Sequence, residues 1–299
     1  MADIAAQTAP GQTAQGQTAP GQTASGQTAQ GRPRRLPGLG PVLATQVRYS
    51  LTMLIRNPRA LVAGLVLPGA LLALQAGKAE HVTMAAAAPR IAGLIAFSAA
   101  AIAFFTHANT LVIAREEGVL RRWRVSPLPA WAYFAGRIVA ATLLTVAAGL
   151  VLVFVAMGMT GLHFSGHAIA GLLADDVLGA LALVALGIAL TPLITSAQAA
   201  QPMLMLIYFP LVILSGEVGS ITDLPHWLTT TMTYLPAQPL VDAISGVLHG
   251  GALMSGHDLA VLAGWTVGGL LISYRFFQWD PHRPAHARRP EGSTTARSA

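Results

Sequence analysis

The sequence predicts an all-α polytopic membrane protein with six transmembrane helices. Of its 299 residues, 54% are hydrophobic and only 10% are charged, and the mean hydropathy is +0.57. Soluble domains carry about 25% charged residues, so this composition disfavours a soluble globular protein. Apolar runs recur along the chain between short polar segments, and most approach the roughly 20 residues that a helix needs to cross a bilayer.

Residues 1–41 are predicted to form a disordered tail followed by a basic linker. Residues 6–30 repeat a polar, Gly-rich unit of five residues (AQTAP, GQTAQ, GQTAP, GQTAS, GQTAQ) that cannot bury a core. No apolar stretch typical of a cleavable signal peptide occurs in the first 40 residues. The tail is expected to be either a dispensable extension or a segment that binds a partner.

An amphipathic helix is predicted at residues 42–56, before the first span. Gln46 and Arg48 lie off its apolar face, and the segment is too short and too polar to cross a membrane. We therefore expect an N-terminal helix in the membrane interface. The apolar residues that share one face at helical spacing are Leu43, Val47, Leu51 and Leu54.

The first two predicted spans contain features that need neighbouring helices. Pro68 lies inside the first, where a neighbouring group must satisfy the carbonyl that its missing N–H leaves free. Thr106 and His107, with Asn109 and Thr110, are expected to face other helices rather than lipid. The six predicted spans cover residues 60–76, 91–114, 138–158, 177–195, 202–214 and 259–274.

The later spans raise alternatives that the sequence leaves open. Asp175 and Asp176 are predicted at the outer start of the fourth span, either as a solvated helix cap or as a substrate or proton site. Gly264 and Gly268 form a GxxxG pattern in the sixth span, which is a weak signal for a helix contact.

The fifth apolar run is too short to span and is followed by a segment without lysine or arginine, residues 215–251. Proline and glycine signals in this segment predict one or two short re-entrant helices at the outer face, between the fifth and sixth spans. Glu217 interrupts the apolar run, so it is a candidate outer gate; the alternative is a water-exposed turn.

Basic residues predict the orientation. Of the 18 Lys and Arg residues, Lys78 and Arg90 lie in the predicted outer loop and the other sixteen lie on the opposite side. The positive-inside rule then places both termini and the central loop in the cytoplasm of a cell-membrane protein. The same distribution accounts for the net charge of +6 without nucleic-acid binding.

Motifs for several chemistries are absent. The chain contains no cysteine, no P-loop and no HExxH or GxSxG motif. His163 and His167 lie near Asp175 and Asp176 in sequence, but their loop spacing is a poor metal signal. We expect no catalytic residue, no metal and no cofactor bound by this chain, and therefore no enzymatic activity of its own.

Residues 115–137 form the densest run of charge in the chain, between the second and third spans. Residues 119–124 are predicted to form a short helix, and Ser126-Pro127 is typical of a helix start. The new helix would continue through Trp131, Tyr133 and Arg137, expected as interface anchors, into the third span. Such a segment is a suitable lever for a force from a soluble partner.

Four features in this order resemble the membrane permease of type-2 ABC exporters, closest to the daunorubicin-resistance-like drug-export branch. The resemblance covers residues 42–275. The features are RNP at 56–58; REEG at 115–118 with SPL at 126–128; FPL at 209–211 with LSG at 214–216; and LPHWL at 224–228 with YLP at 234–236 and PLVDA at 239–243.

This resemblance implies a homodimer bound to two copies of a cytoplasmic ABC ATPase, which would hold the ATP and Mg²⁺. Residues 42–275 would form the transmembrane domain, surrounded by membrane lipids, and residues 276–299 a disordered cytoplasmic tail. The substrate is expected to be hydrophobic or amphipathic: a drug, an antibiotic or a lipid-like molecule. The alternative is an ion-coupled secondary transporter or another polytopic membrane protein. The implied coupling helix, which docks on the ATPase, contains Glu116, Glu117, Gly118, Leu120, Arg121, Arg122 and Arg124.

Overall fold

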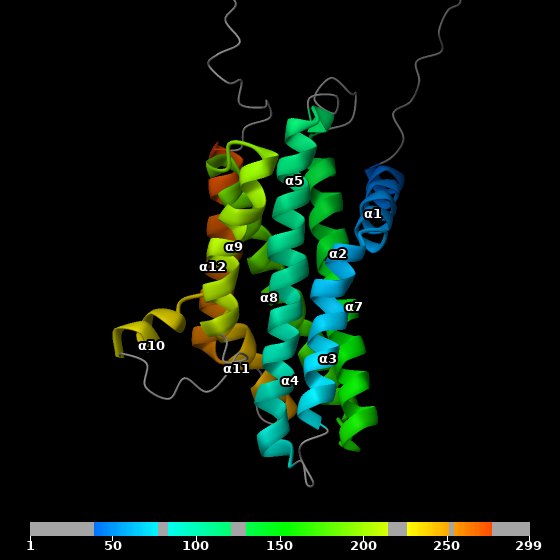
Figure 1. Ribbon diagram of the computed structural model, residues 1–299, viewed down its shortest axis with the longest axis vertical. Coiled ribbons are helices and arrows are strands. Elements are labelled where there is room, and N and C mark those ends of the chain that lie inside the picture. Colours follow the sequence, from blue (N-terminus) through cyan, green and yellow to red (C-terminus); the bar gives the residue numbers. More distant parts are fainter. Residues whose placement is uncertain (1–38, 77–82, 121–129, 215–225, 251–253, 277–299) are drawn as a thin grey trace, which may run out of the picture. The chain divides into compact units, whose positions relative to one another are not determined.

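The described part of the chain is helical and contains no strand (Figure 1). The computed structural model describes residues 39–76, 83–120, 130–214, 226–250 and 254–276. The predicted all-α fold is therefore confirmed. The helices are α1 (Leu39–Ile55), α2 (Pro58–Leu61), π-helical η1 (Val62–Val66), α3 (Leu67–Ala76), α4 (Met84–Ala99), π-helical η2 (Ala100–Thr106), α5 (His107–Glu116), α7 (Ala130–Thr160), α8 (Gly166–Leu190), η3 (Thr191–Leu193), α9 (Ala197–Leu214), α10 (His226–Met232), α11 (Ala237–Leu248) and α12 (Gly256–Phe276).

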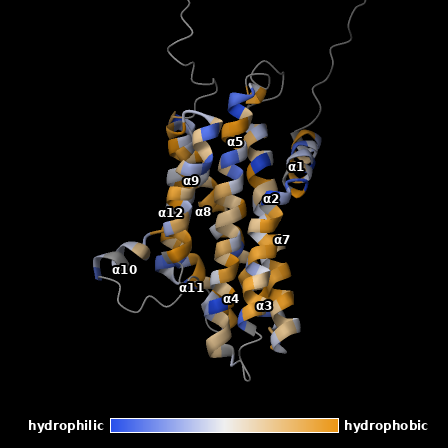
Figure 2. Ribbon diagram, viewed as in Figure 1, coloured by the Kyte–Doolittle hydropathy of each residue, from blue (hydrophilic) through white to orange (hydrophobic). Residues whose placement is uncertain are grey.

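Four described helical runs are long and apolar enough to cross a membrane: Ala85–Glu116, Trp131–Thr160, Gly166–Leu193 and Gly256–Phe276. They correspond to the second, third, fourth and sixth predicted spans, and apolar residues colour much of their length in Figure 2. The first and fifth correspond to the shorter apolar helices Val62–Gln75 and Ala197–Ile213. The six-span layout as a whole stays a prediction. Arg90, expected in a loop, lies inside α4.

The proline in the first predicted span is satisfied by a neighbouring helix, as expected. In an α-helix the residue at position 68 would donate its N–H to the carbonyl of Gly64, and Pro68 has no N–H to give. The Ser98 hydroxyl of α4 donates to that Gly64 carbonyl instead. The helix widens into the π-helical turn η1 directly before Leu67 and Pro68. One side-chain contact between α4 and η1 thus allows the proline in this helix.

Substitution of Ser98 by alanine is expected to lower the free energy of unfolding by about 1–2 kcal/mol, because a buried carbonyl loses its donor. Pro68→Ala restores a backbone N–H, so the cost of Ser98→Ala should shrink in the Pro68→Ala background. Denaturant unfolding of the purified protein and its three variants measures this coupling. Equal costs of Ser98→Ala in both backgrounds would contradict the assignment.

The fourth helix begins earlier than predicted. α7 ends at a turn in which Gly161 has a φ of +69°, a value that favours glycine, and α8 then begins at Gly166 rather than at residue 177. Ser165 caps α8, because its Oγ accepts a hydrogen bond from Ala168 N at 3.1 Å. The predicted start was wrong because the two aspartates were read as the limit of the apolar run.

α8 lies at the centre of the helix packing and contacts α4, α7, α11 and α12. Two of its glycines allow the close approach of α11. A Cβ on Gly171 would lie 2.8 Å from Val247 Cγ1, and one on Gly179 would overlap Leu240. α11 in turn buries Leu240 and Ile244 completely. One or two short helices were predicted after the fifth span; two are present, α10 and α11, and α11 is part of the core.

α1 is helical as predicted, and it also buries polar residues that lie off its predicted apolar face. Gln46 and Ser50 are each only 6% exposed, and Gln46 packs against Gly136 of α7. Tyr49 and Met53 are exposed. The burial of Gln46 was not predicted, because it depends on the space that Gly136 of α7 leaves, and the pattern within α1 contains no information about that helix.

Candidate functional site

The end of α5 is hydrogen-bonded to the connection between α8 and α9. The Arg115 side chain is buried, and its two terminal nitrogens donate to backbone carbonyls: Nη1 to Thr191 at 3.0 Å and Nη2 to Ile194. These carbonyls belong to η3 and the residue after it, where a helix ends and leaves acceptors unsatisfied. A planar guanidinium with several donors suits two acceptors of this kind.

The next residue, Glu116, is hydrogen-bonded to the start of α9. Glu116 Oε2 accepts a hydrogen bond from the backbone N–H of Ala197, the first residue of α9. Ser196 Oγ accepts from Ala199 N at 3.2 Å. Both oxygens lie at a helix N-terminus, where free N–H groups and the helix dipole favour acceptors and negative charge. Arg115 and Glu116 together, here called the α5 clasp, therefore connect the end of α5 to two successive helices.

The chain turns sharply immediately after the α5 clasp. Glu116 and Glu117 are exposed, and Gly118 has a φ of +71°. A left-handed residue after a helix end is commonly glycine, because a side chain would clash there. Leu120 then returns to the interior and is fully buried. The turn presents two carboxylates at the surface between two buried anchors, Arg115 and Leu120.

Only part of the predicted coupling helix lies within the described residues. The structure brings Glu116, Glu117, Gly118 and Leu120 together at the end of α5. Arg121, Arg122 and Arg124 lie outside the described residues, as do Ser126-Pro127 and the candidate gate Glu217. Arg115 was missed as a site residue, because an arginine at the end of a span is already explained by the positive-inside rule.

Two of the three predicted interface anchors at the start of α7 are buried, and the anchoring role of Trp131 stays a prediction. Trp131 is 51% exposed, but Tyr133 and Arg137 are buried at 3% and 8%. Arg137 Nη1 donates to Tyr133 Oη at 3.2 Å, and Nη2 donates to Thr110 Oγ1 at 2.7 Å. The positive side chain lies inside the packing of α5 and α7 because hydroxyl groups on both helices accept its hydrogen bonds.

The two aspartates of α8 are not a solvated helix cap. Asp175 and Asp176 lie ten and eleven residues after Ser165, and they are 5% and 0% exposed. Neither oxygen of Asp176 has a hydrogen-bond partner among the described residues. A Cβ on Gly149 of α7 would lie 2.6 Å from Asp176 Oδ2. The carboxyl therefore occupies space that this glycine leaves.

These carboxyls do not form a metal site with the nearby histidines. His163 and His167 are exposed, while the two aspartates are buried deeper along α8. Among the described residues, no three His, Asp or Glu side chains are arranged to hold one ion.

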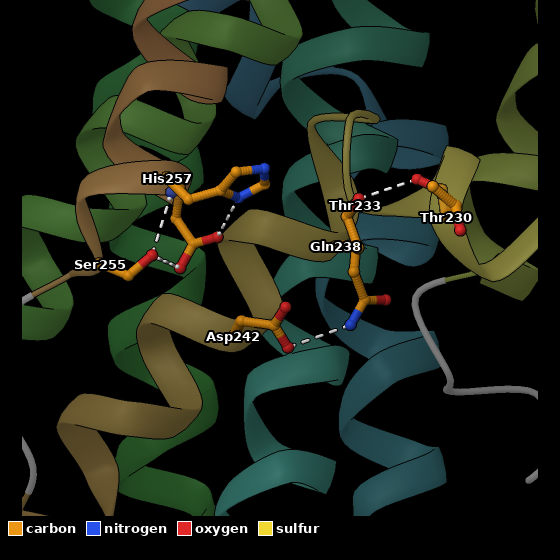
Figure 3. Close-up of polar contacts among 7 residues, drawn as sticks. Thr230, Thr233, Gln238, Asp242, Ser255 and His257 are labelled. Atoms are coloured by element: carbon orange, nitrogen blue, oxygen red, sulfur yellow. Dashed lines mark hydrogen bonds and ion pairs between the residues drawn. The ribbon is translucent and has the colours of Figure 1, made fainter.

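Polar contacts at the ends of α10, α11 and α12 are mostly local (Figure 3). Gln238 Nε2 donates to Asp242 Oδ1 at 3.0 Å within α11, and Thr233 Oγ1 donates to Thr230 O at 2.8 Å. Trp265 of α12 joins separate elements, because its Nε1 donates to the Tyr234 carbonyl at 2.7 Å. These contacts fix helix ends and do not gather groups for a reaction.

One face of α9 is open. Leu206 is 76% and Phe209 53% exposed. A groove of about 670 Å³ runs along this face and includes the polar side chains of Gln198 and Gln201 beside these apolar residues. The open face begins directly after the helix start that the α5 clasp holds.

Comparison with known proteins adds a family to this geometry. The family model described as ABC-2 type transporter matches residues 43–249. Two curated proteins described as probable multidrug ABC transporter permease YbhR, from Escherichia coli strain K12 and Escherichia coli O157:H7, are each 27% identical over 128 residues. The alignment covers 43% of this chain and 34% of each relative, so the chain matches about a third of their length.

Proposed function

Because the chain belongs to the ABC-2 type transporter family, and is thus a transporter membrane subunit rather than an enzyme, we propose that it is the permease of an ATP-driven exporter. The α5 clasp is the observation that carries this proposal. Directly before the turn at Glu117 and Gly118, Arg115 donates to Thr191 of η3 and Glu116 accepts from Ala197 at the start of α9. A force on that turn would move α9 and its open face.

The source of that force is a separate ATPase subunit. The chain contains no P-loop of its own. The coupling segment begins with the exposed carboxylates Glu116 and Glu117 and continues with Arg121, Arg122 and Arg124. Charges of both signs on one short segment suit a specific polar contact with a soluble protein. Two permease copies would engage two ATPase subunits, which bind ATP and Mg²⁺.

A second copy of the chain would cover the open face of α9. Gln198 and Gln201 lie on this face beside Leu206 and Phe209, and amide side chains are poorly suited to face lipid. Two such faces opposed in a homodimer would enclose a mainly apolar path. Its lining favours a hydrophobic or amphipathic substrate, in keeping with the multidrug description of the relatives. The daunorubicin-resistance branch remains a prediction.

The orientation follows from charge. Sixteen of the 18 basic residues lie on the side of the α5 clasp and the two termini in the predicted layout. The positive-inside rule would place that side in the cytoplasm, where the ATPase is.

Reversing two charges in the coupling segment tests the proposal. We expect the double variant Glu117→Arg, Arg121→Glu to lose transport at least tenfold while unfolding at the same temperature, because the exposed carboxylate of Glu117 contributes little to stability. Co-purification of the ATPase should fall with transport. Arg48→Glu is the matched control, since it also reverses an exposed charge. Normal export by the double variant would refute the coupling role.

Asp176 supports a second candidate function, ion-coupled secondary transport. Buried, unpartnered carboxyls in a span are often proton or substrate sites. Transport in vesicles distinguishes the two functions. ATP-driven export should stop when ATP is depleted and survive collapse of the proton gradient; an ion-coupled transporter would show the opposite pattern.

A further inference from the structure

A cavity of about 260 Å³ lies between α1, α5 and α7, and neither residue of the α5 clasp lines it. Met53 and Ile113 contribute apolar side chains to its wall. Ser50, His107 and Arg137 contribute polar ones, and Glu117 lies at its exposed end. We call this cavity the head-group cavity. It combines an apolar surface with a buried positive charge, which is the pattern of a site for an amphipathic anion.

Arg137 supplies a charge that has no counter-ion. Its side chain is 8% exposed, its Nη1 and Nη2 donate to the neutral hydroxyls of Tyr133 and Thr110, and its Nε has no acceptor. No carboxylate of the described residues forms an ion pair with it; Glu117, which also lines the cavity, is exposed to solvent. Buried charges in proteins are generally paired or bind a ligand of opposite charge.

His107 adds a second group without a partner. It is 1% exposed, it lines the same cavity, and neither Nδ1 nor Nε2 has a hydrogen-bond partner among the described residues. An imidazole donates from at least one ring nitrogen in either protonation state. An oxyanion in the cavity would therefore find a donor from His107 as well as the guanidinium of Arg137.

The depth of the cavity suits a lipid-like head group. α7 has 31 residues and is therefore about 46 Å long, close to the 40–45 Å of a bilayer with its head groups. Arg137 lies seven residues after Ala130, or about 10 Å from the helix end. The exposed Trp131 lies one residue after Ala130, at that helix end, and tryptophan is enriched at the membrane interface. The volume lies below the 300–1,000 Å³ typical of pockets that enclose a whole drug-sized ligand, so it suits a head group.

We propose that the head-group cavity binds the phosphate head group of an anionic amphipathic molecule, with its apolar part lying along Met53 and Ile113 toward the membrane. The Arg137 guanidinium neutralises the phosphate through charge-assisted hydrogen bonds, and His107 donates a further one. Binding needs neither ATP nor a partner subunit, so it can be measured on the resting protein whether or not the export function holds.

The test uses the full chain in a neutral detergent and compares three probes: dioctanoyl phosphatidylglycerol, dioctanoyl phosphatidylcholine and inorganic phosphate. We expect the anionic lipid, in excess, to raise the unfolding temperature by about 5 °C, because it binds the folded state alone. The other two should have little effect. Equal shifts with both lipids would overturn the anionic selectivity. A full shift with inorganic phosphate would overturn the amphipathic ligand.

Three variants locate the binding. Arg137→Met removes the charge at similar length and should remove the lipid-specific shift, whereas Arg48→Met, at an exposed arginine of α1, should retain it. Met53→Trp fills the cavity from a residue that is 56% exposed and should remove the shift without unfolding the protein. Met53→Trp therefore decides the question even if Arg137→Met does not fold. A shift that persists in Met53→Trp would place the ligand elsewhere and refute the proposal.

Discussion

Replacement of Arg115 by methionine is expected to lower the free energy of unfolding by about 2–5 kcal/mol, because two backbone carbonyls lose their donor at once. Both carbonyls, of Thr191 and Ile194, lie where α8 gives way to α9. The buried residues around them leave little room for water to replace the guanidinium: Arg115 is 3%, Thr191 1% and Ile194 2% exposed. Denaturant unfolding of the purified protein measures the loss.

The controls for this prediction separate the contact from the charge. Arg48→Met removes an exposed arginine and should change stability by less than about 0.5 kcal/mol. Arg115→Lys keeps the charge but replaces the planar fork by a single ammonium, so we expect an intermediate loss. If Arg115→Met unfolded at the same denaturant concentration as the native chain, the α5 clasp would not be a structural contact.

The same variant links stability to transport. With the guanidinium gone, the α5 clasp keeps the Glu116 hydrogen bond to Ala197 at the start of α9 and loses the two bonds to Thr191 and Ile194. Under conditions in which the variant is still folded, we expect ATPase binding to persist and transport to fall, because the exposed Glu116 contact alone transmits less of the force to α9. Loss of ATPase binding together with transport would instead place Arg115 in the docking surface itself.

Local patterns predicted most of the helices correctly. Pro68 was expected to need a neighbouring donor, and Ser98 supplies it. Thr106 and His107 were expected to face other helices, and both are buried. Such predictions succeed because the demand arises within the segment itself: a missing N–H or a polar side chain in an apolar run must be satisfied somewhere.

The predictions failed where the answer depended on a distant neighbour. Arg115 bonds residues 76 and 79 positions away, a contact that no local pattern contains. Asp175 and Asp176 were read as a helix start because carboxyls are costly inside a span. The actual start of α8 is marked by the turn residue Gly161 and the cap residue Ser165. The prediction relied on the apolar run instead of these two residues.

The contact between α8 and α12 likewise depends on a helix that is distant in sequence. Gly264 and Gly268 form the GxxxG pattern, yet a Cβ added to either would meet nothing within 4 Å. The close approach is made by Gly269, where an added Cβ would lie 2.8 Å from Ala185 C and 2.9 Å from Ala185 O. The GxxxG pattern identified a glycine-rich helix, but the glycine that the packing against α8 requires is Gly269, which is not part of the pattern.

Adjacent glycines on α12 therefore should respond to alanine with opposite signs. Gly269→Ala is expected to destabilise the protein by about 1–3 kcal/mol, because Ala185 backbone atoms cannot move aside as a flexible side chain would. Gly268→Ala has free space and should be neutral or stabilising by about 0.4–1 kcal/mol, since alanine restricts the unfolded chain. Unfolding of both variants under one condition measures the difference. Equal effects, or the reverse order, would mean that α12 presents a different face to α8.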